Sequence, residues 1–323
     1  MKNKISLIKK RGFTNFLRIT IVGGNTTMIY VTKKFDDLTF VDDYMFALAN
    51  EKNPNIPIGE IELLTKVKVD ALEIVKSQYS IDNYLEAKSI RYDVYAKDDK
   101  SNKHYDIEMQ TTSDPALIKR ARYYASTMDG EALAKGQTYD KLADTFVIFI
   151  CTYNPFPSQN SAIYIERPSL LKKVNETEVD ITKETQYKNG CVKIYLNTSV
   201  DLNTVKNKDL RAFIEFINTG IATNDFTKEI EKTVLEQKQN SLERMRYMTF
   251  QQELQNSQKE WYTHGKKDGV EEGTKQTKRD AVIKFYSNGL SISAIADGLS
   301  LTVEQVEEII SSNSDDYQEN TKS

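Results

Sequence analysis

Carboxylates recur at alternate positions in the segment IRYDVYAKDDKSNKHYDIEMQTTSDP, which spans residues 90–115. The segment predicts two antiparallel strands joined by a turn centred between residues 100 and 101. Asp93 then faces Glu108, and Gln110 lies on the same side of the hairpin. Facing side chains have Cβ atoms about 5 Å apart, so two like charges there destabilise the pair. Solvent screening, a retained proton or a bound cation must offset that repulsion.

The rest of the chain restricts the chemistry that such a pair could perform. The only histidines, His104 and His264, lie in polar stretches with no nucleophile beside them, which counts against a catalytic triad. The only cysteines, Cys151 and Cys191, lack the spacing of metal ligands, and no glycine-rich phosphate loop is present. Carboxylate and amide oxygens are ligands of hard divalent cations such as magnesium. The hairpin therefore predicts either a solvated polar face or a site for a magnesium or manganese ion.

The segments around the hairpin predict the elements that would position it. A capped helix over 39–53 is followed by a second short helix at 57–67. After the hairpin, Pro115 and Gly136 delimit another helix. The continuously apolar segment TFVIFICT, at 145–152, predicts a strand covered on both faces. Helix, strands, helix and buried strand in this order are typical of a mixed α/β layer fold.

Five blocks carry a family resemblance: LTFVDDYMFALA, IRYDVYAKDDKSNKHYDIEMQTT, KRARYYASTMD, KGQTYDKLADTFVIFICTYNPF and KIYLNT. In order and spacing, over roughly residues 36–250, they resemble the PD-(D/E)XK family transposases and the Rpn-type recombination-promoting nucleases of bacteria. The resemblance implies a restriction-endonuclease-like mixed sheet flanked by helices. The residues after about 226 themselves predict a charged helical C-terminal region. It also implies a DNA endonuclease that depends on magnesium or manganese and is associated with mobile elements or recombination.

The family pattern implies that Asp93 and Glu108 are metal ligands and that Gln110 stands where the family usually has lysine. Glutamine has no titratable proton, so Gln110 would orient a water molecule and would not act as a general base. The replacement also removes a positive charge from the site. On this reasoning, Gln110→Lys is expected to keep or raise activity.

Four further residues are candidates for supporting the site. Arg120 and Tyr124 share one stripe of the helix after the hairpin, and Arg120 could hold a DNA phosphate if that stripe faces the hairpin. The alternative is an ion pair between Arg120 and a carboxylate, Glu108 included. Gln137 and Asp43 occupy family-like blocks and are candidates for a supporting role behind the metal ligands. The alternative for Gln137 is an ordinary loop residue. Asp42 and Asp43 stand together at the start of the first helix, and a helix N-cap role would explain one of them.

The two ends of the chain differ in composition from its centre. The first 34 residues contain eight Lys or Arg and no Asp or Glu, so 1–35 is a basic extension. This extension is interpreted as a disordered segment or a start placed too early, with a nucleic-acid-binding arm as the alternative. From Ser291 to Ser323, seven acidic residues stand against Lys322 alone, which favours protein contact or capping over DNA binding. The predicted divisions are 1–35, a nuclease-like domain at 36–225, a charged helical region at 226–280, a small helical end at 281–311 and a polar tail at 312–323.

Composition also bears on location and partners. No run of 18 or more apolar residues occurs, so no membrane span is expected, and basic residues interrupt any secretory signal at the N-terminus. Two lone cysteines suit a reducing cytoplasm. The expected partner is DNA, and a homodimer is left open. The net charge of −3 counts against strong non-specific DNA binding, which keeps open a catalytically weak or inactive DNA-binding or protein-interaction module.

Overall fold

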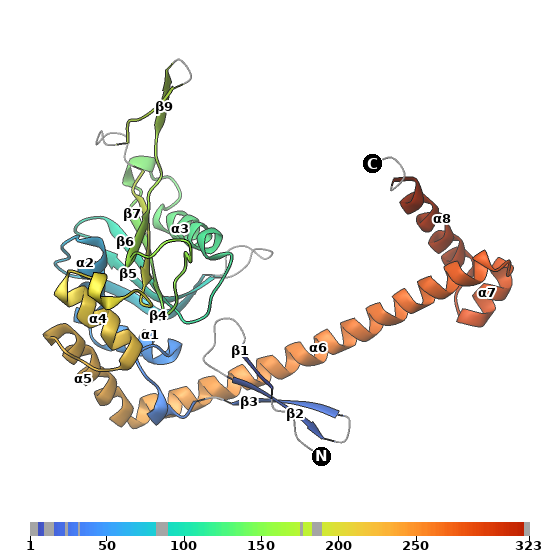
Figure 1. The fold of residues 1–323 in the computed structure, drawn as a ribbon, viewed down its shortest axis with the longest axis horizontal. Helices are drawn as coiled ribbons and strands as arrows, with labels where there is room; N and C mark the ends of the chain where they lie inside the picture. The colour runs from blue at the N-terminus through green and yellow to red at the C-terminus, as the bar shows by residue number, and fades with distance from the viewer. Residues whose placement is uncertain are drawn as a thin grey trace. The chain divides into compact units, whose positions relative to one another are not determined.

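The fold is seen in a computed structural model, which describes residues 6–9, 16–22, 25–31, 33–81, 90–174, 177–182 and 189–319. The chain divides into two compact units, Met1–Thr249 and Phe250–Ser323. Figure 1 shows the elements of each unit. The candidate residues of the hairpin all lie in the first unit.

A six-stranded mixed sheet forms the centre of the first unit. Its first three strands are antiparallel neighbours, the next two run parallel to the third, and the last is antiparallel to its neighbour. The predicted apolar strand lies inside this sheet with nearly all its residues buried, as continuous apolarity requires. In spatial order the strands are β4 (Glu73–Ile81), β5 (Ile90–Asp98), β6 (Lys103–Gln110), β7 (Asp144–Cys151), β11 (Cys191–Asn197) and β8 (Ile163–Glu166).

Helices cover both faces of the sheet. Figure 1 shows α3 on one side, and α1, α2, α4 and α5 on the other. The predicted mixed sheet flanked by helices is therefore confirmed. The helices are α1 (Asp43–Lys52), α2 (Asn55–Thr65), α3 (Leu117–Ala132), α4 (Lys208–Thr219) and α5 (Asp225–Gln239).

Helix α3 covers the side of the sheet on which Glu108 and Gln110 meet Arg120. Its buried stripe, Leu117, Ala121, Ala125 and Met128, recurs every three to four residues and packs with Phe149 and other buried sheet residues in one core cluster. The helix begins just after Pro115, whose neighbour Asp114 accepts the N–H of Ala116, and it ends four residues before Gly136. It is thus shorter at both ends than the sequence predicts.

Smaller strands lie outside the main sheet. The basic extension, for which the sequence predicts no regular structure, contains an antiparallel sheet of β1 (Ser6–Lys9), β2 (Phe16–Val22) and β3 (Asn25–Val31). A two-stranded ribbon follows β8 and consists of β9 (Leu171–Val174) and β10 (Thr177–Asp180).

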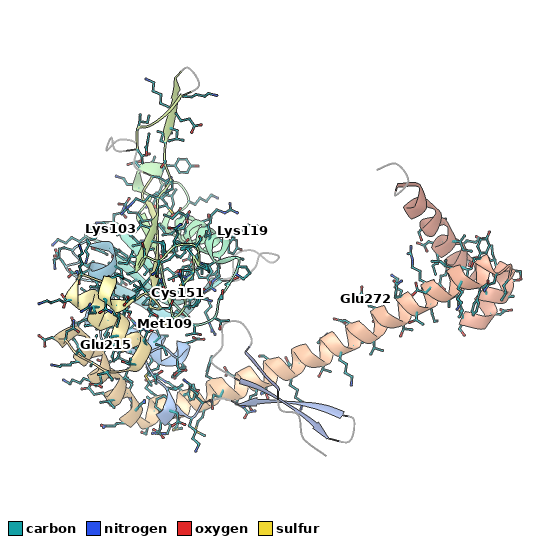
Figure 2. All side chains as sticks on the ribbon, viewed as in Figure 1. Lys103, Met109, Lys119, Cys151, Glu215 and Glu272 are labelled. Atoms are coloured by element: carbon teal, nitrogen blue, oxygen red, sulfur yellow. The ribbon has the colours of Figure 1, made fainter. Side chains whose placement is uncertain are left out.

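The second unit is helical. Helix α6 (Ser241–Ser287) extends into it, and Figure 2 shows the side chains along this helix, Glu272 among them, many of which are exposed. Helices α7 (Ile292–Leu299) and α8 (Val303–Glu319) follow, as the alternation of helix and turn predicts. Among the described helices, none is both long and apolar enough to cross a membrane. A small core of this unit consists of Val282, Ile295, Ala296 and Val306.

Candidate active site

The β5–β6 hairpin has the predicted register. Val94 pairs with Ile107, and Tyr95 pairs with Asp106. These pairs place Asp93 opposite Glu108, at the point where the backbone ladder between the strands ends. The face assigned to polar residues is therefore the face that carries Asp106, Glu108 and Gln110 of β6.

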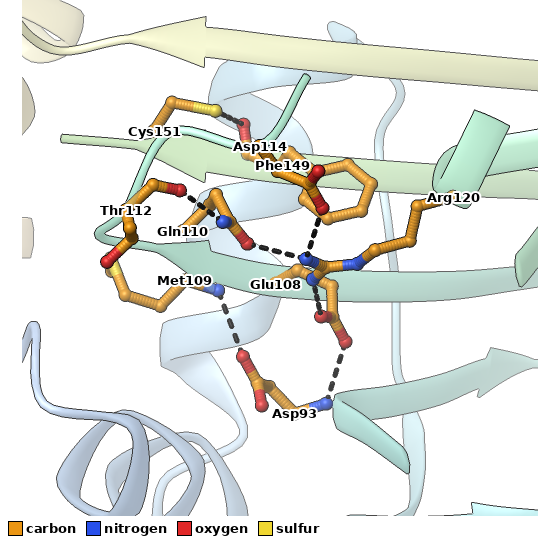
Figure 3. Close-up of polar contacts among 9 residues, drawn as sticks. All are labelled: Asp93, Glu108, Met109, Gln110, Thr112, Asp114, Arg120, Phe149 and Cys151. Atoms are coloured by element: carbon orange, nitrogen blue, oxygen red, sulfur yellow. Dashed lines mark hydrogen bonds and ion pairs between the residues drawn. The ribbon is translucent and has the colours of Figure 1, made fainter. Parts of the chain in front are cut away.

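The carboxylates of Asp93 and Glu108 each accept a backbone hydrogen bond from the other strand of the hairpin. The Asp93 backbone N–H donates to Glu108 Oε1 at 2.9 Å, and the Met109 N–H donates to Asp93 Oδ2 at 3.1 Å (Figure 3). Each carboxylate thus accepts a backbone N–H from the opposite strand, in place of a ladder bond. Both side chains are fixed in position before any ligand arrives.

The strict alternation predicted for β5 fails at Tyr92. Alternation along a strand places residues three apart on opposite faces, yet the rings of Tyr92 and Tyr95 stack with centroids 5.4 Å apart, in the core cluster beneath α3. The described ladder between β5 and β6 ends at Val94, so the two-residue period no longer holds on the Asp93 side of that point.

The polar face of β6 is buried, which rules out the alternative of a solvated face. Asp106 is 0% exposed, Glu108 3% and Gln110 6%. Burial, and then the Asp93 charge, raise the pKa of Glu108 to about 8. Burial also raises the pKa of Asp93 to about 6. The site therefore carries carboxylates whose charged forms are costly unless a cation or a donor compensates them.

Asp106 is the most isolated of these groups. Both of its carboxylate oxygens are buried without a donor. Its pKa is raised well above the usual value, by burial first and by the Glu108 charge second. A protonated Asp106 can donate a hydrogen bond to Glu108. That bond would give the buried Asp106 carboxyl a partner and would stabilise the charged form of Glu108. The sequence places Asp106 on this face but assigns it no role.

Arg120 of α3 places its guanidinium group against the Glu108 carboxylate. Its Nη2 donates to Glu108 Oε2 at 2.9 Å, and its Nη1 donates to Gln110 Oε1 at 2.8 Å (Figure 3). Its guanidinium carbon lies 4.9 Å from the ring centroid of Phe149 and 5.3 Å from that of Tyr124. The stripe of Arg120 and Tyr124 thus faces the hairpin, and the alternative of an ion pair with Glu108 is the arrangement present.

Gln110 has both ends of its amide engaged. While Oε1 accepts from Arg120, Nε2 donates to the carbonyl of Thr112. The second lone pair of Oε1 and the second N–H of the amide can still meet a water molecule, so the orientation of a water molecule by Gln110 stays a prediction. In this structure Gln110 fixes Arg120.

Asp43 approaches the site from α1. Burial, and then the charge of Asp93, raise its pKa to about 7, so the two carboxyl groups are electrostatic neighbours. Asp42 is the N-cap residue of α1, so the cap position explains Asp42 and leaves Asp43 as the first residue of the helix. Arg91 is exposed and was not among the candidate residues. Its positive charge offsets part of the rise in the pKa of both Asp43 and Asp93. Its place next to Asp93 on the strand was the only signal.

Gln137 is not brought to the site. It is exposed in the loop between α3 and β7, and its Oε1 accepts the N–H of Ala134. That loop leads into the first residue of β7, whereas Glu108 and Gln110 lie at the last residues of the parallel neighbour β6. Gln137 therefore belongs to the opposite end of the strands.

The donor set fits a hard divalent cation in its chemistry. Asp93 and Glu108 offer oxygen atoms, and burial, the main cause of their raised pKa values, makes their charged forms costly unless a cation offsets the charge. Within the described part of the chain, no three His, Cys, Asp or Glu side chains are arranged to hold a metal. Magnesium is often held by only one or two carboxylates together with water and phosphate, so a pair of carboxylates is compatible with magnesium binding.

The sequence was also compared with known proteins. A family model described as PD-(D/E)XK nuclease family transposase matches residues 40–273. No curated protein and no solved structure matched the chain. The matched range contains α1, the hairpin, β7 and all the residues grouped around Glu108.

Proposed function

Since the chain belongs to the PD-(D/E)XK nuclease family transposases, we propose that it is an endonuclease that hydrolyses phosphodiester bonds of DNA with a divalent metal. The observation that carries this proposal is the reciprocal bonding of Asp93 and Glu108, which fixes two carboxylates side by side at the open end of a hairpin. Fixed carboxylates lose little entropy when they bind a cation, so the site is organised in advance.

In this proposal Asp93 and Glu108 hold magnesium or manganese. When bound, the metal supplies Lewis-acid stabilisation of the phosphate and an acidified water. Asp43 adds negative charge behind Asp93, which favours cation binding. Arg120, 28% exposed, offers its guanidinium to the negative charge of a phosphate that approaches Glu108. Tyr124 lies against Arg120 and limits its movement.

The biological setting is part of the same proposal. The family is one of transposases, which supports a role with mobile elements or in recombination. The predicted domain limits, the cytoplasmic location and the homodimer stay predictions, as does the role of the basic extension.

One observation favours a second candidate, a nuclease-fold protein that binds DNA or protein without cutting. Glu108 already has a counter-charge in Arg120, and glutamine stands where the family usually has lysine. A supercoiled plasmid incubated with the protein, with and without magnesium, separates the two candidates. Nicked or linear product that requires the metal supports the nuclease, whereas DNA binding by gel shift without any cleavage supports the module.

A further inference from the structure

We infer that Arg120 provides, beside Glu108, the positive charge that a lysine at position 110 would provide, and that Gln110 is the residue that positions it. This inference rests on the proposed nuclease function and concerns the residues that act at that site. It also reverses the expectation that Gln110→Lys keeps or raises activity.

The contacts of Gln110 link its identity to that of Arg120. The amide nitrogen donates to the Thr112 carbonyl, so the amide oxygen must point the other way, toward Arg120 Nη1. A lysine has three donors and no acceptor. Lysine at position 110 would therefore lose the bond to Arg120 and place an ammonium group against the guanidinium.

Contacts on several sides hold the Arg120 guanidinium beside Glu108, with part of it exposed to solvent. Its two nitrogen atoms bridge Glu108 and Gln110, and the guanidinium lies against the rings of Phe149 and Tyr124. Arginine suits such a place because its planar fork can bond two oxygens while it stacks on aromatic faces. The side chain remains 28% exposed, so one part of the cation faces the solvent from which a phosphate would approach.

A purely structural ion pair is the competing explanation. In that case Arg120 neutralises a buried Glu108 and nothing more, and its loss destabilises the fold without a specific effect on cleavage. Moving the positive charge from position 120 to position 110 separates these explanations. If the charge matters and its source does not, lysine at position 110 should work only when Arg120 is absent.

The experiment uses the full chain as wild type, Gln110→Lys, Arg120→Met and the double variant. Arg122→Met is the matched control, because Arg122 is an exposed arginine on the same helix. We expect each single variant at positions 110 and 120 to cut plasmid DNA about 100-fold more slowly, the usual effect of losing one preorganised electrostatic group. The double variant should recover at least about 10-fold over either single variant, while Arg122→Met stays near the wild-type rate.

Two further readouts do not depend on cleavage. By calorimetry, magnesium should bind more tightly to Arg120→Met and more weakly to Gln110→Lys than to wild type, because the charge next to Glu108 changes. In thermal melting, Gln110→Lys should lower the melting temperature strongly in the wild-type background and only slightly in the Arg120→Met background. This dependence on background is the signature of the direct contact.

The results that overturn the inference are distinct from those that overturn the proposed function. A double variant no faster than the slower single variant, although the wild type cuts DNA, would show that lysine cannot replace Arg120. A melting effect of Gln110→Lys that is the same in both backgrounds would show that Gln110 does not position Arg120. If the wild type itself does not cut, the proposed function and the role of Arg120 in it both fail, and the melting comparison decides the positioning role of Gln110.

Discussion

Asp93 donates its backbone N–H to the Glu108 carboxylate, and its own carboxylate accepts an N–H from the strand that carries Glu108. Two like charges are thus kept adjacent by bonds to the backbone, while both pKa values are raised. Such an arrangement is costly in an empty protein, because buried carboxylates favour the neutral form. In the proposed function, a cation bound between them would offset that cost.

The first prediction concerns metal binding. Asp93→Asn keeps an oxygen that can accept the Met109 N–H, but it removes one negative charge from the site. We expect magnesium affinity, measured by isothermal titration calorimetry, to fall at least about 10-fold, or ~1.4 kcal/mol. The far-UV circular dichroism spectrum should not change. Equal affinity for the wild type and the variant would place the metal elsewhere.

The second prediction concerns the stability of the buried ion pair. Since Glu108 is 3% exposed, its loss cannot be neutral, as it would be on a solvated face. Glu108→Ala removes the carboxylate that accepts from Arg120 Nη2, while Arg120 keeps its contacts with Gln110 and Asp114. Breaking a fully buried pair costs about 3–5 kcal/mol. Because Arg120 is 28% exposed, we expect a decrease of about 2 kcal/mol in the free energy of unfolding, measured in urea.

Glu108→Gln is the control for that measurement. Its amide oxygen can still accept one of the two donors, so the decrease should be clearly smaller than for Glu108→Ala. If the two variants lose the same stability, the bonds at Glu108 contribute little to folding.

The third prediction concerns pH and Glu60, a residue of α2. Glu60 is 0% exposed, neither of its oxygens has a partner, and burial raises its pKa well above the usual value. The folded protein therefore holds this proton more tightly than the unfolded chain. The contribution of this proton to the free energy of unfolding is fully present below the unfolded pKa of about 4.3. It decreases as pH rises above that value and is lost once pH passes the folded pKa.

Glu60→Gln removes this dependence. Between pH 5 and pH 8 the variant should gain stability relative to the wild type, by up to about 1.4 kcal/mol per pH unit until the folded pKa is reached. Glu62→Gln on the same helix is the control, because the pKa of Glu62 is lowered and its charge does not change in this range. A stability difference for Glu60→Gln that is constant with pH would show that Glu60 is already ionised in the folded protein.

The fourth prediction concerns the C-terminal end. Val282 and the residues of α7 and α8 form a core of their own, within the second unit. The acidic balance beyond Ser291 disfavours phosphate contact. Removal of residues 281–323 should therefore leave metal-dependent cleavage within about twofold of the full chain. Loss of cleavage by a truncated protein that still melts cooperatively would assign this end a part in the reaction.

Much of the hairpin could be predicted from the sequence, because its local pattern decides it. Alternation and the position of the turn predict the register that pairs Tyr95 with Asp106. The apolar run predicts the buried strand β7, and Pro115 predicts the start of α3 within two residues. The same register groups Asp93, Glu108 and Gln110, and the resemblance added their roles as two metal ligands and the third motif position.

The contacts across the site depend on tertiary placement, which periodicity does not determine. Nothing in the spacing of α3 shows which stripe meets β6, so the choice of Arg120 between phosphate and Glu108 stayed open. The second bond of the Gln110 amide, to Thr112, depends on the path of the loop after β6. The break in alternation at Tyr92 arises because side chains replace ladder bonds at Asp93, and that exchange has no sequence signal.

The measurement that tests the central claim most directly is plasmid cleavage by the wild type and by Glu108→Gln, each with and without magnesium. The Glu108→Gln variant preserves the size of the side chain, and circular dichroism and thermal melting would confirm that it is folded. Nicked or linear DNA should form only with the wild type in the presence of magnesium. Cleavage by Glu108→Gln at the wild-type rate, or cleavage by the wild type that is unaffected by EDTA, would contradict a metal-dependent site at Asp93 and Glu108.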